Sequence, residues 1–272
     1  MTIHQVGFIL KDNMGKKIVE TTHKDLTILY YTSNYLDDHN PYFLSNTMNT
    51  LKKAIGDTHV ISVSHKPMDF GENICVGDIG RSNRNIYWQI LQGAKAAKTK
   101  YVATAEDDAL YPPEHFQCRP AKDTLYYDMN KWSIFTWSKP MVYSWRDRMI
   151  IFTLICERDL LVDALEERLE ARPEYNDAFC GEPGRYDEVL RVTPRKWEKG
   201  WAGAPMVVFS HPDALGYITT PPGRTHAVGE RKALGPLRGT YLVPWGDVHS
   251  VMKLYDEDYT YKQCPTCGQE VV

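Results

Sequence analysis

Residues 100–108 read Lys100-Tyr101-Val102-Ala103-Thr104-Ala105-Glu106-Asp107-Asp108, so three acids directly follow a short apolar run. The apolar run predicts a buried strand, and the acids would then lie at the carboxyl edge of a sheet, where open α/β folds bind ligands. Neighbouring carboxylates in a low dielectric repel one another unless a cation or raised pKa values relieve the repulsion. Oxygen-only ligands favour Mg²⁺ or Mn²⁺ with a phosphate-bearing partner. The alternative is a solvated turn, in which an Asp caps a helix that begins at Tyr111-Pro112-Pro113-Glu114.

A helix is predicted before this strand. Residues 77–85 read Gly77-Asp78-Ile79-Gly80-Arg81-Ser82-Asn83-Arg84-Asn85, and apolar residues recur at helical spacing from Ile86 to Ala94. Arg81 and Arg84 would lie in the first turn, where backbone N–H groups and guanidinium groups together favour an anion. Either arginine can instead pair with a carboxylate.

The first half of the chain shows a β-α-β order. Residues 26–31 form an apolar run typical of a buried parallel strand, and Thr32, Ser33 and Asn34 follow it as a polar loop. A helix is predicted over 41–55 and a second strand over 59–63. The loop over 65–80 is long, and loops of this length over strand ends are often functional.

This order resembles the core of nucleotide-sugar glycosyltransferases of the GT-A fold, family 2 type. The family typically has a small-Ala-Arg-Asn sequence, a helix, Tyr-Ile/Val, a run of Asp, apolar residues and Pro. The resemblance covers roughly the first half of the chain. It implies an α/β fold: a GT-A (Rossmann-like) mixed sheet flanked by helices, with a C-terminal acceptor region and a short Cys-x-x-Cys tail. The domains expected are a nucleotide-sugar-binding core over 1–188, a basic, aromatic acceptor or lid region over 189–255, and a tail over 256–272.

The resemblance also implies an activity: transfer of a sugar from a nucleoside diphosphate sugar, such as a UDP-sugar, to an acceptor hydroxyl. Asp108 with Glu106 or Asp107 would hold Mn²⁺ or Mg²⁺ across the two phosphates of the donor. The loop Thr32-Ser33-Asn34 would hold the nucleoside, with Tyr31 as a stacking partner, and Asp107 would also contact the donor. The donor-binding arginines would be Arg81, Arg84 and Arg224.

Other roles stay open among several residues. A general base for the acceptor hydroxyl is expected beyond the midpoint of the chain, and the candidates are Asp187, Glu188 and Glu198. Members of this fold often complete the metal shell with a late His, for which His226 and His249 are candidates. Residues 223–226 read Gly-Arg-Thr-His between prolines and Gly229, which predicts a mobile lid.

The acceptor of such a transferase would be a soluble glycan, a protein or a hydroxymethylated base in DNA, the last as in bacteriophage genome modification. From 189 to 240, Lys and Arg outnumber acids, with Trp197 and Trp201 interleaved. Such a region is often a set of solvated loops, but a polyanionic acceptor would require it, and this favours DNA. Two further classes are a nucleotidyltransferase, which should carry a Gly-rich phosphate loop after the first strand, and a non-catalytic zinc-ribbon adaptor.

Composition sets the broad class. The chain has 272 residues, of which 43% are hydrophobic and 25% charged, as is ordinary for a globular protein. Its net charge of −3 does not indicate an overall preference for nucleic acid. The sequence has no apolar run long enough for a membrane helix and no signal peptide, so we expect a cytoplasmic protein, in the host cytoplasm if the gene is from a phage. Cys264 and Cys267 form half of a zinc-ribbon signature, so Zn²⁺ would need other ligands; two reduced thiols are the simpler state.

Overall fold

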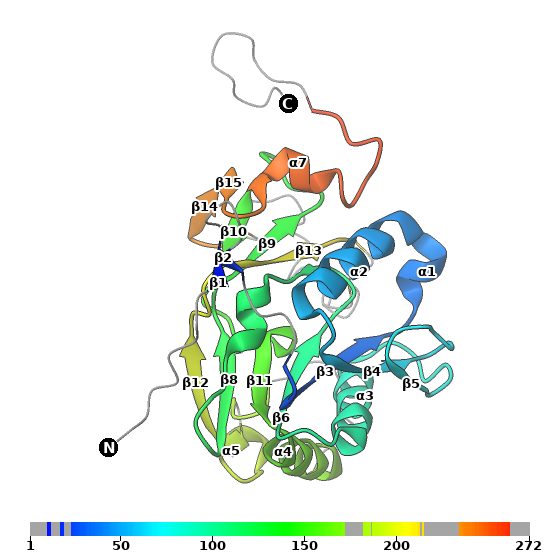
Figure 1. Cartoon of the computed structure of the whole chain (residues 1–272), viewed down its shortest axis with the longest axis vertical. Coiled ribbons are helices and arrows are strands. Elements are labelled where there is room, and N and C mark those ends of the chain that lie inside the picture. Colours follow the sequence, from blue (N-terminus) through cyan, green and yellow to red (C-terminus); the bar gives the residue numbers. More distant parts are fainter. Residues whose placement is uncertain are drawn as a thin grey trace.

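The structure is a computed structural model that describes residues 10–11, 17–18, 23–171, 182–185, 187–212, 214 and 234–261. Its main sheet has seven strands in the order β12-β8-β11-β6-β3-β4-β5 (Figure 1). Neighbours are parallel from β6 to β5, whereas β11 is antiparallel to both β6 and β8, and β12 is parallel to β8. The strands are β3 (Leu26–Thr32), β4 (His59–Ser64), β5 (Glu72–Cys75), β6 (Tyr101–Ala105), β8 (Thr124–Asp128), β11 (Leu154–Glu157) and β12 (Lys196–Gly200).

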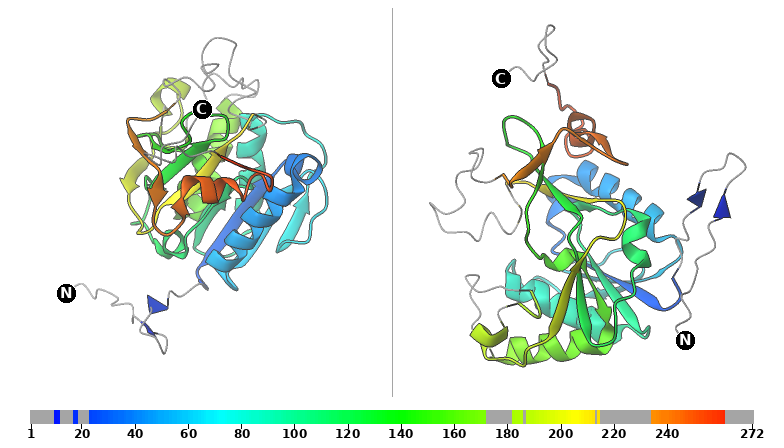
Figure 2. Two further views of the ribbon diagram at one scale, coloured as in Figure 1. Left: turned by 90° about the horizontal axis from the view of Figure 1, so that it is seen from above. Right: turned by 90° about the vertical axis from the view of Figure 1, so that its left-hand side faces the viewer.

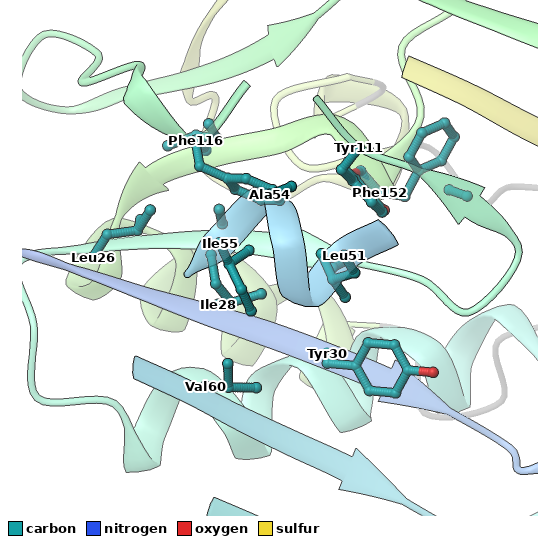
Figure 3. Packing of buried hydrophobic residues seen from close by; sticks show 14 of the residues in the cluster. Leu26, Ile28, Tyr30, Leu51, Ala54, Ile55, Val60, Tyr111, Phe116 and Phe152 are labelled. Carbon is teal, nitrogen blue, oxygen red and sulfur yellow. The ribbon is translucent and has the colours of Figure 1, made fainter. Parts of the chain in front are cut away.

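Helices cover both faces of this sheet. Helix α2 (Pro41–Ile55) packs Leu51, Ala54 and Ile55 on β3 and β4 (Figure 3). Its start is set by Pro41 and by the Asn40 side chain, which accepts a hydrogen bond from the Phe43 N–H. Helices α3 (Asn83–Ala96) and α4 (Arg158–Ala171) pack together on the opposite face, over a second apolar cluster. Two short helices, α1 (Tyr35–His39) and α5 (Asp187–Leu190), follow β3 and precede β12.

A second sheet has the strand order β14-β10-β9-β13-β7 and lies above the main sheet in the side view (Figure 2). Its short strand β7 comes three residues after β6, so Glu106, Asp107 and Asp108 are the link by which the chain passes from one sheet to the other. The strands are β7 (Ala109–Leu110), β9 (Lys131–Phe135), β10 (Tyr143–Trp145), β13 (Met206–Ser210) and β14 (Leu237–Gly239).

The remaining elements are short. They are the hairpin β1 (Leu10–Lys11) and β2 (Lys17–Ile18), the hairpin β15 (Tyr241–Leu242) and β16 (Gly246–Asp247), the 3₁₀ helices η1 (Pro113–Gln117) and η2 (Ile151–Thr153), and helix α7 (Val248–Met252). Within the described ranges, no helix has the length and apolarity needed to cross a bilayer.

The predicted mixed α/β sheet flanked by helices is confirmed, as are the helix over 41–55 and the strands over 26–31, 59–63 and 101–105. Some elements differ. The loop over 65–80 contains β5, and the helix predicted from Tyr111 is only the 3₁₀ helix η1. Residues 149–155 are a mostly apolar run in the sequence, typical of a strand, but they fold as the 3₁₀ helix η2 followed by the start of β11. The Cys264–Cys267 tail and the lid with Arg224 and His226 lie outside the described residues.

Candidate functional site

Glu106 and Asp107, the first two acids of the link, are held by residues of β3 and α2. The Tyr31 hydroxyl donates a hydrogen bond to Glu106 Oε1, and the Thr32 hydroxyl donates to Asp107 Oδ2 at 2.6 Å. Because β3 lies directly beside β6 in parallel, the ends of the two strands meet, as the strand-end argument predicts. The Thr47 hydroxyl of α2 donates to the Asp107 carbonyl oxygen at 2.7 Å, which ties the link to the helix above it.

Asp108 is the least satisfied of the three acids. Its backbone oxygen accepts a hydrogen bond from the Phe209 N–H, so β13 fixes its position. Its side chain is 16% exposed, and Oδ2 lies 3.9 Å from His211 Nε2. Its Oδ1 is buried and has no hydrogen-bond partner in the described part of the chain. An orphaned carboxylate oxygen is costly and calls for a ligand.

Burial and mutual repulsion raise the pKa values of all three carboxyl groups. Burial, with the charges of Asp107 and Glu182, raises the pKa of Glu106 to about 7, although the Tyr31 hydroxyl opposes the shift. Burial also raises the pKa of Asp107, against the effects of Thr32 and Arg81. Burial and the charges of Glu106 and Asp107 raise the pKa of Asp108 well above its usual range. The site therefore holds unfavourable negative charge, which a bound cation would relieve.

A pocket of about 400 Å³ opens beside the acids, over the ends of β3 and β4. Thr32, which bonds Asp107, also lines this pocket, together with Asn34 and Lys66. Asn34 adopts a left-handed conformation with φ 57°, and its side chain bonds Asp37 and the Lys66 N–H, so the loop after β3 is rigidly shaped. Tyr30 adds a buried hydroxyl that has no partner among the described residues and points away from the apolar cluster (Figure 3). The pocket therefore offers polar groups to a ligand.

The two arginines before and in α3 lie on the approach to the acids. Ser82 caps α3 by accepting a hydrogen bond from the Asn85 N–H, so Arg84 lies in the first turn as predicted, whereas Arg81 lies just before the helix. The Arg81 guanidinium lies over the Tyr35 ring, 4.1 Å from its centroid, and its charge lowers the pKa of Asp107. Arg84 has a buried Nε without a partner in the described ranges. The start of a 14-residue helix with these two cations suits an anion.

The chain is similar in fold to solved glycosyltransferases. One is a glycosyltransferase involved in the glycosylation of the major capsid of PBCV-1, with TM-score 0.43 and 12% identity over 67% of this chain and 92% of that chain. Another is residues 1–349 of S. aureus TarS in complex with UDP-GlcNAc, with TM-score 0.39 and 11% identity over 68% of this chain and 58% of that one. A TarS structure of which this chain covers 37% has TM-score 0.36 and 10% identity. No protein-family model and no curated protein matches the sequence.

The structure places Asp187 away from the three acids. Its carboxylate pairs with Arg168 Nη2 at 2.7 Å and also accepts the N–H groups of Gly184 and Arg195. Strand β12 runs in the same direction as β6, because β12 is parallel to β8 and both β8 and β6 are antiparallel to β11. Helix α5 precedes β12, so it lies at the edge of the main sheet where these strands begin, next to α4 (Figure 1). The three acids lie at the opposite edge, where β6 ends. Both carboxylate oxygens of Asp187 are bonded within the protein, and Glu188 is an exposed residue of the same helix.

Glu198 and His249 also have surroundings unlike those predicted. Glu198 lies in the middle of the edge strand β12, three strands from β6 and not at a strand end. His249 bonds the Tyr259 hydroxyl at 2.8 Å and stacks on the Tyr261 ring at 3.8 Å. Tyr31 is buried and bonded to Glu106, so its ring is not available for stacking on a base.

Sequence reasoning missed two residues near the acids. Glu182 is buried, its Oε2 lies 3.5 Å from Arg185, and its charge raises the pKa of Glu106. His211 is also buried and approaches Asp108. His211 directly follows the apolar run of β13, so the strand-end argument that selected residues 106–108 would have found it. Glu182 has no comparable signal in the sequence, because no apolar run typical of a strand directly precedes it.

Proposed function

We propose that this protein is a glycosyltransferase that moves a sugar from a nucleoside diphosphate sugar, a UDP-sugar, to an acceptor hydroxyl. The observation that carries the proposal is the carboxylate trio directly after β6, beside the end of the parallel strand β3, in which Asp108 keeps a buried oxygen without a partner among the described residues. A pocket over the ends of β3 and β4 and a helix start with Arg81 and Arg84 supply the other features that a nucleoside diphosphate needs.

In this proposal the nucleoside lies in the pocket lined by Thr32 and Asn34. Ser33, which joins them in the chain, is not part of the pocket's lining. The diphosphate extends toward the start of α3, where Arg84 offers its buried, unpartnered Nε and Arg81 is held in place by the Tyr35 ring. Guanidinium groups fixed in this way stabilise the charge that develops on the departing diphosphate. Arg224 belongs to the same proposal from the sequence alone.

A divalent cation, Mg²⁺ or Mn²⁺, is part of the proposal. No group of three His, Cys, Asp or Glu side chains in the described ranges is arranged to hold a metal. Mg²⁺ at nucleotide sites, however, is usually bound by one or two carboxylates together with substrate phosphates. Asp108 fits as such a ligand, because its Oδ1 is buried and unpartnered and its pKa is raised by neighbouring acids. When bound, the cation would neutralise charge on the leaving diphosphate.

The acceptor hydroxyl would attack the anomeric carbon of the donor sugar, a new C–O bond would form, and the bond to the diphosphate would break. The proton of the hydroxyl needs a base within hydrogen-bond reach. Glu182 is the acid we propose for this role in place of Asp187, since burial raises its pKa and it lies within electrostatic range of Glu106. A carboxylate with a raised pKa binds a proton more strongly than an ordinary one.

The test is incubation of the protein with Mn²⁺ and a panel of nucleotide sugars, measuring slow release of nucleoside diphosphate. We expect release from one nucleoside class, and none from the Asp108→Asn variant, whose side chain keeps its shape. Mn²⁺ binding, followed by electron paramagnetic resonance in the presence of the nucleoside diphosphate, should be lost in the same variant. Absence of release and of nucleotide binding across the whole panel would refute the proposal.

A further inference from the structure

A single hydroxyl group joins the pocket to the acids. Thr32, the last residue of β3, is only 6% exposed, and its Oγ1 donates a hydrogen bond to Asp107 Oδ2 at 2.6 Å. The same Oγ1 accepts a hydrogen bond from the Asn34 N–H at 2.9 Å. A hydroxyl has one hydrogen to donate, so the Thr32 side chain has none left for a ligand in the pocket. Its hydroxyl therefore bonds two parts of the protein to each other.

On the pocket side, this hydroxyl shapes the loop after β3. A threonine hydroxyl that bonds the backbone two residues later closes a turn, and here that residue, Asn34, has a φ of 57°. The Asn34 side chain in turn bonds Asp37 at 2.7 Å and the Lys66 N–H at 2.9 Å. Asn34, Asp37 and Lys66 all line the pocket. The pocket wall is thus built on the turn that the Thr32 hydroxyl closes.

On the acid side, Asp107 is held at two points. The Thr47 hydroxyl of α2 bonds its carbonyl oxygen at 2.7 Å, and the Thr32 hydroxyl bonds its carboxylate. The bond from Thr47 fixes the backbone but leaves the side-chain torsions of Asp107 free to change. The bond from Thr32 orients the carboxylate itself, and hydrogen bonds to ionised groups are among the stronger ones.

Thr32 is also anchored to α3. The buried Gln89 side chain donates through Nε2 to the carbonyl oxygens of Thr32 at 3.0 Å and Val63 at 3.1 Å, near the ends of β3 and β4. The helix can lie this close to the sheet because Gly93, one turn later, has no side chain; a Cβ there would lie 3.2 Å from Val63 Cγ2. The first turn of the same helix carries Arg84. The pocket, the acids and the arginine helix therefore meet at Thr32.

We propose that Thr32 is a positioning residue, which orients the Asp107 carboxylate for the cation and the diphosphate; this inference rests on the proposed function. The nucleoside and the diphosphate belong to one donor molecule, so the pocket and the carboxylates must keep a set separation. Loss of the hydroxyl would leave the Thr32 methyl group in the pocket wall but would let the carboxylate turn. A misplacement of about 1 Å can cost about a hundredfold in rate. The loss should therefore appear in turnover and in the metal-dependent part of binding.

The experiment compares Thr32→Val, which keeps the shape and removes the hydroxyl, with Thr32→Ser, which keeps the hydroxyl. Calorimetry measures the affinity for uridine diphosphate in EDTA and again with Mn²⁺, and donor hydrolysis is measured per folded molecule. We expect Thr32→Val to bind uridine diphosphate in EDTA as wild type does. Its kcat, and the gain in affinity that Mn²⁺ gives, should each fall about tenfold, the effect of one hydrogen bond to a charged group. Thr32→Ser should restore both.

Thr27→Val is the matched control, because it is the same substitution near the other end of β3. Thr27 is fully buried, and its hydroxyl bonds the Thr99 hydroxyl at 2.7 Å and the His59 ring at 3.2 Å. Urea denaturation should show a lowered unfolding free energy for Thr27→Val, as for Thr32→Val. The kcat of Thr27→Val and its gain in affinity from Mn²⁺ should equal those of wild type.

A direct contact between Thr32 and the nucleoside would give the opposite pattern for Thr32→Val: weaker binding in EDTA and an unchanged kcat. That result, equal kcat losses in Thr32→Val and Thr27→Val, or no rescue by Thr32→Ser would overturn the proposal. An active wild type with a fully active Thr32→Val would refute this inference alone. A wild type that releases no nucleoside diphosphate from any nucleotide sugar would refute the proposed function, and this inference with it.

Discussion

Asp187 offers the sharpest test of whether a predicted base is catalytic or structural. Its carboxylate and the Arg168 guanidinium are 4% and 2% exposed, and their atoms lie 2.7 Å apart. Removing one partner of such a pair leaves a buried charge uncompensated, which costs about 3–5 kcal/mol. Here the N–H groups of Gly184 and Arg195 lose their acceptor as well. Since a domain has only about 5–15 kcal/mol of stability, the Asp187→Leu variant should lose a large part of it.

The assay is urea denaturation of four proteins: wild type, Asp187→Leu, Arg168→Met and the double variant. We expect each single variant to lose about 3–5 kcal/mol, and the double variant to lose much less than their sum, because no charge is then left unpaired. Glu188→Gln, on the exposed side of the same helix, should stay within about 0.5 kcal/mol of wild type. Donor hydrolysis per folded molecule should be kept in all of them. A fully stable Asp187→Leu that no longer transfers sugar would refute the structural role.

Three further predictions concern the site. Asp108→Asn should abolish release of nucleoside diphosphate. The same variant should raise the unfolding free energy of the unliganded protein, as measured in urea, because it removes repulsion with Glu106 and Asp107. A destabilised variant would contradict the electrostatic argument. Arg84→Gln should weaken nucleoside diphosphate binding about tenfold by calorimetry, because one charge-assisted contact is lost. Lys98→Gln, just beyond the carboxyl end of α3, should leave this affinity unchanged. Burial lowers the pKa of Lys131 to about 8 in the folded protein, against about 10.5 in the unfolded chain. Below pH 8 the buried charge therefore lowers the free energy of unfolding. This free energy rises by up to about 3 kcal/mol as the pH increases to about 10.5, because the folded protein loses the proton first. Urea denaturation at pH 7 and pH 10 should show that Lys131→Met is more stable than wild type at pH 7, and that this difference in unfolding free energy shrinks at pH 10. A difference that stays constant would exclude the lowered pKa.

The sequence predicts the elements whose side chains follow a clear period. Strand β3 is fully buried and reads as an apolar run, and α2 carries its apolar residues at helical spacing between Pro41 and Gly56. Strand β5, in contrast, is half exposed at the edge of the sheet and has no apolar run, so it appears as loop. Strand β8 is entirely buried although it begins and ends with Thr124 and Asp128, polar residues that mask the pattern.

Within the site, the sequence finds what depends on strand ends and misses what depends on packing between distant segments. The contact between Thr32 and Asp107 follows from two neighbouring parallel strands that each end in polar residues. The choice between Asp187 and Glu182 cannot be made in that way. The sequence offers Asp187 as an acid beyond the midpoint of the chain, but its carboxylate pairs with Arg168, 19 residues earlier in α4, and only the packed structure shows this contact.

The position of the trio between two sheets explains how the fold tolerates its charge. The backbone oxygens of Asp107 and Asp108 are bonded to Thr47 and to the Phe209 N–H, so the link cannot relax to move its side chains into water. The penalty is then almost wholly electrostatic and confined to the carboxylates, and a cation with a diphosphate can remove it without rearranging the backbone. A loop with unsatisfied backbone groups would instead refold around its ligand. The rigid link therefore favours a site that is organised before the ligand arrives, as electrostatic stabilisation of a leaving group requires.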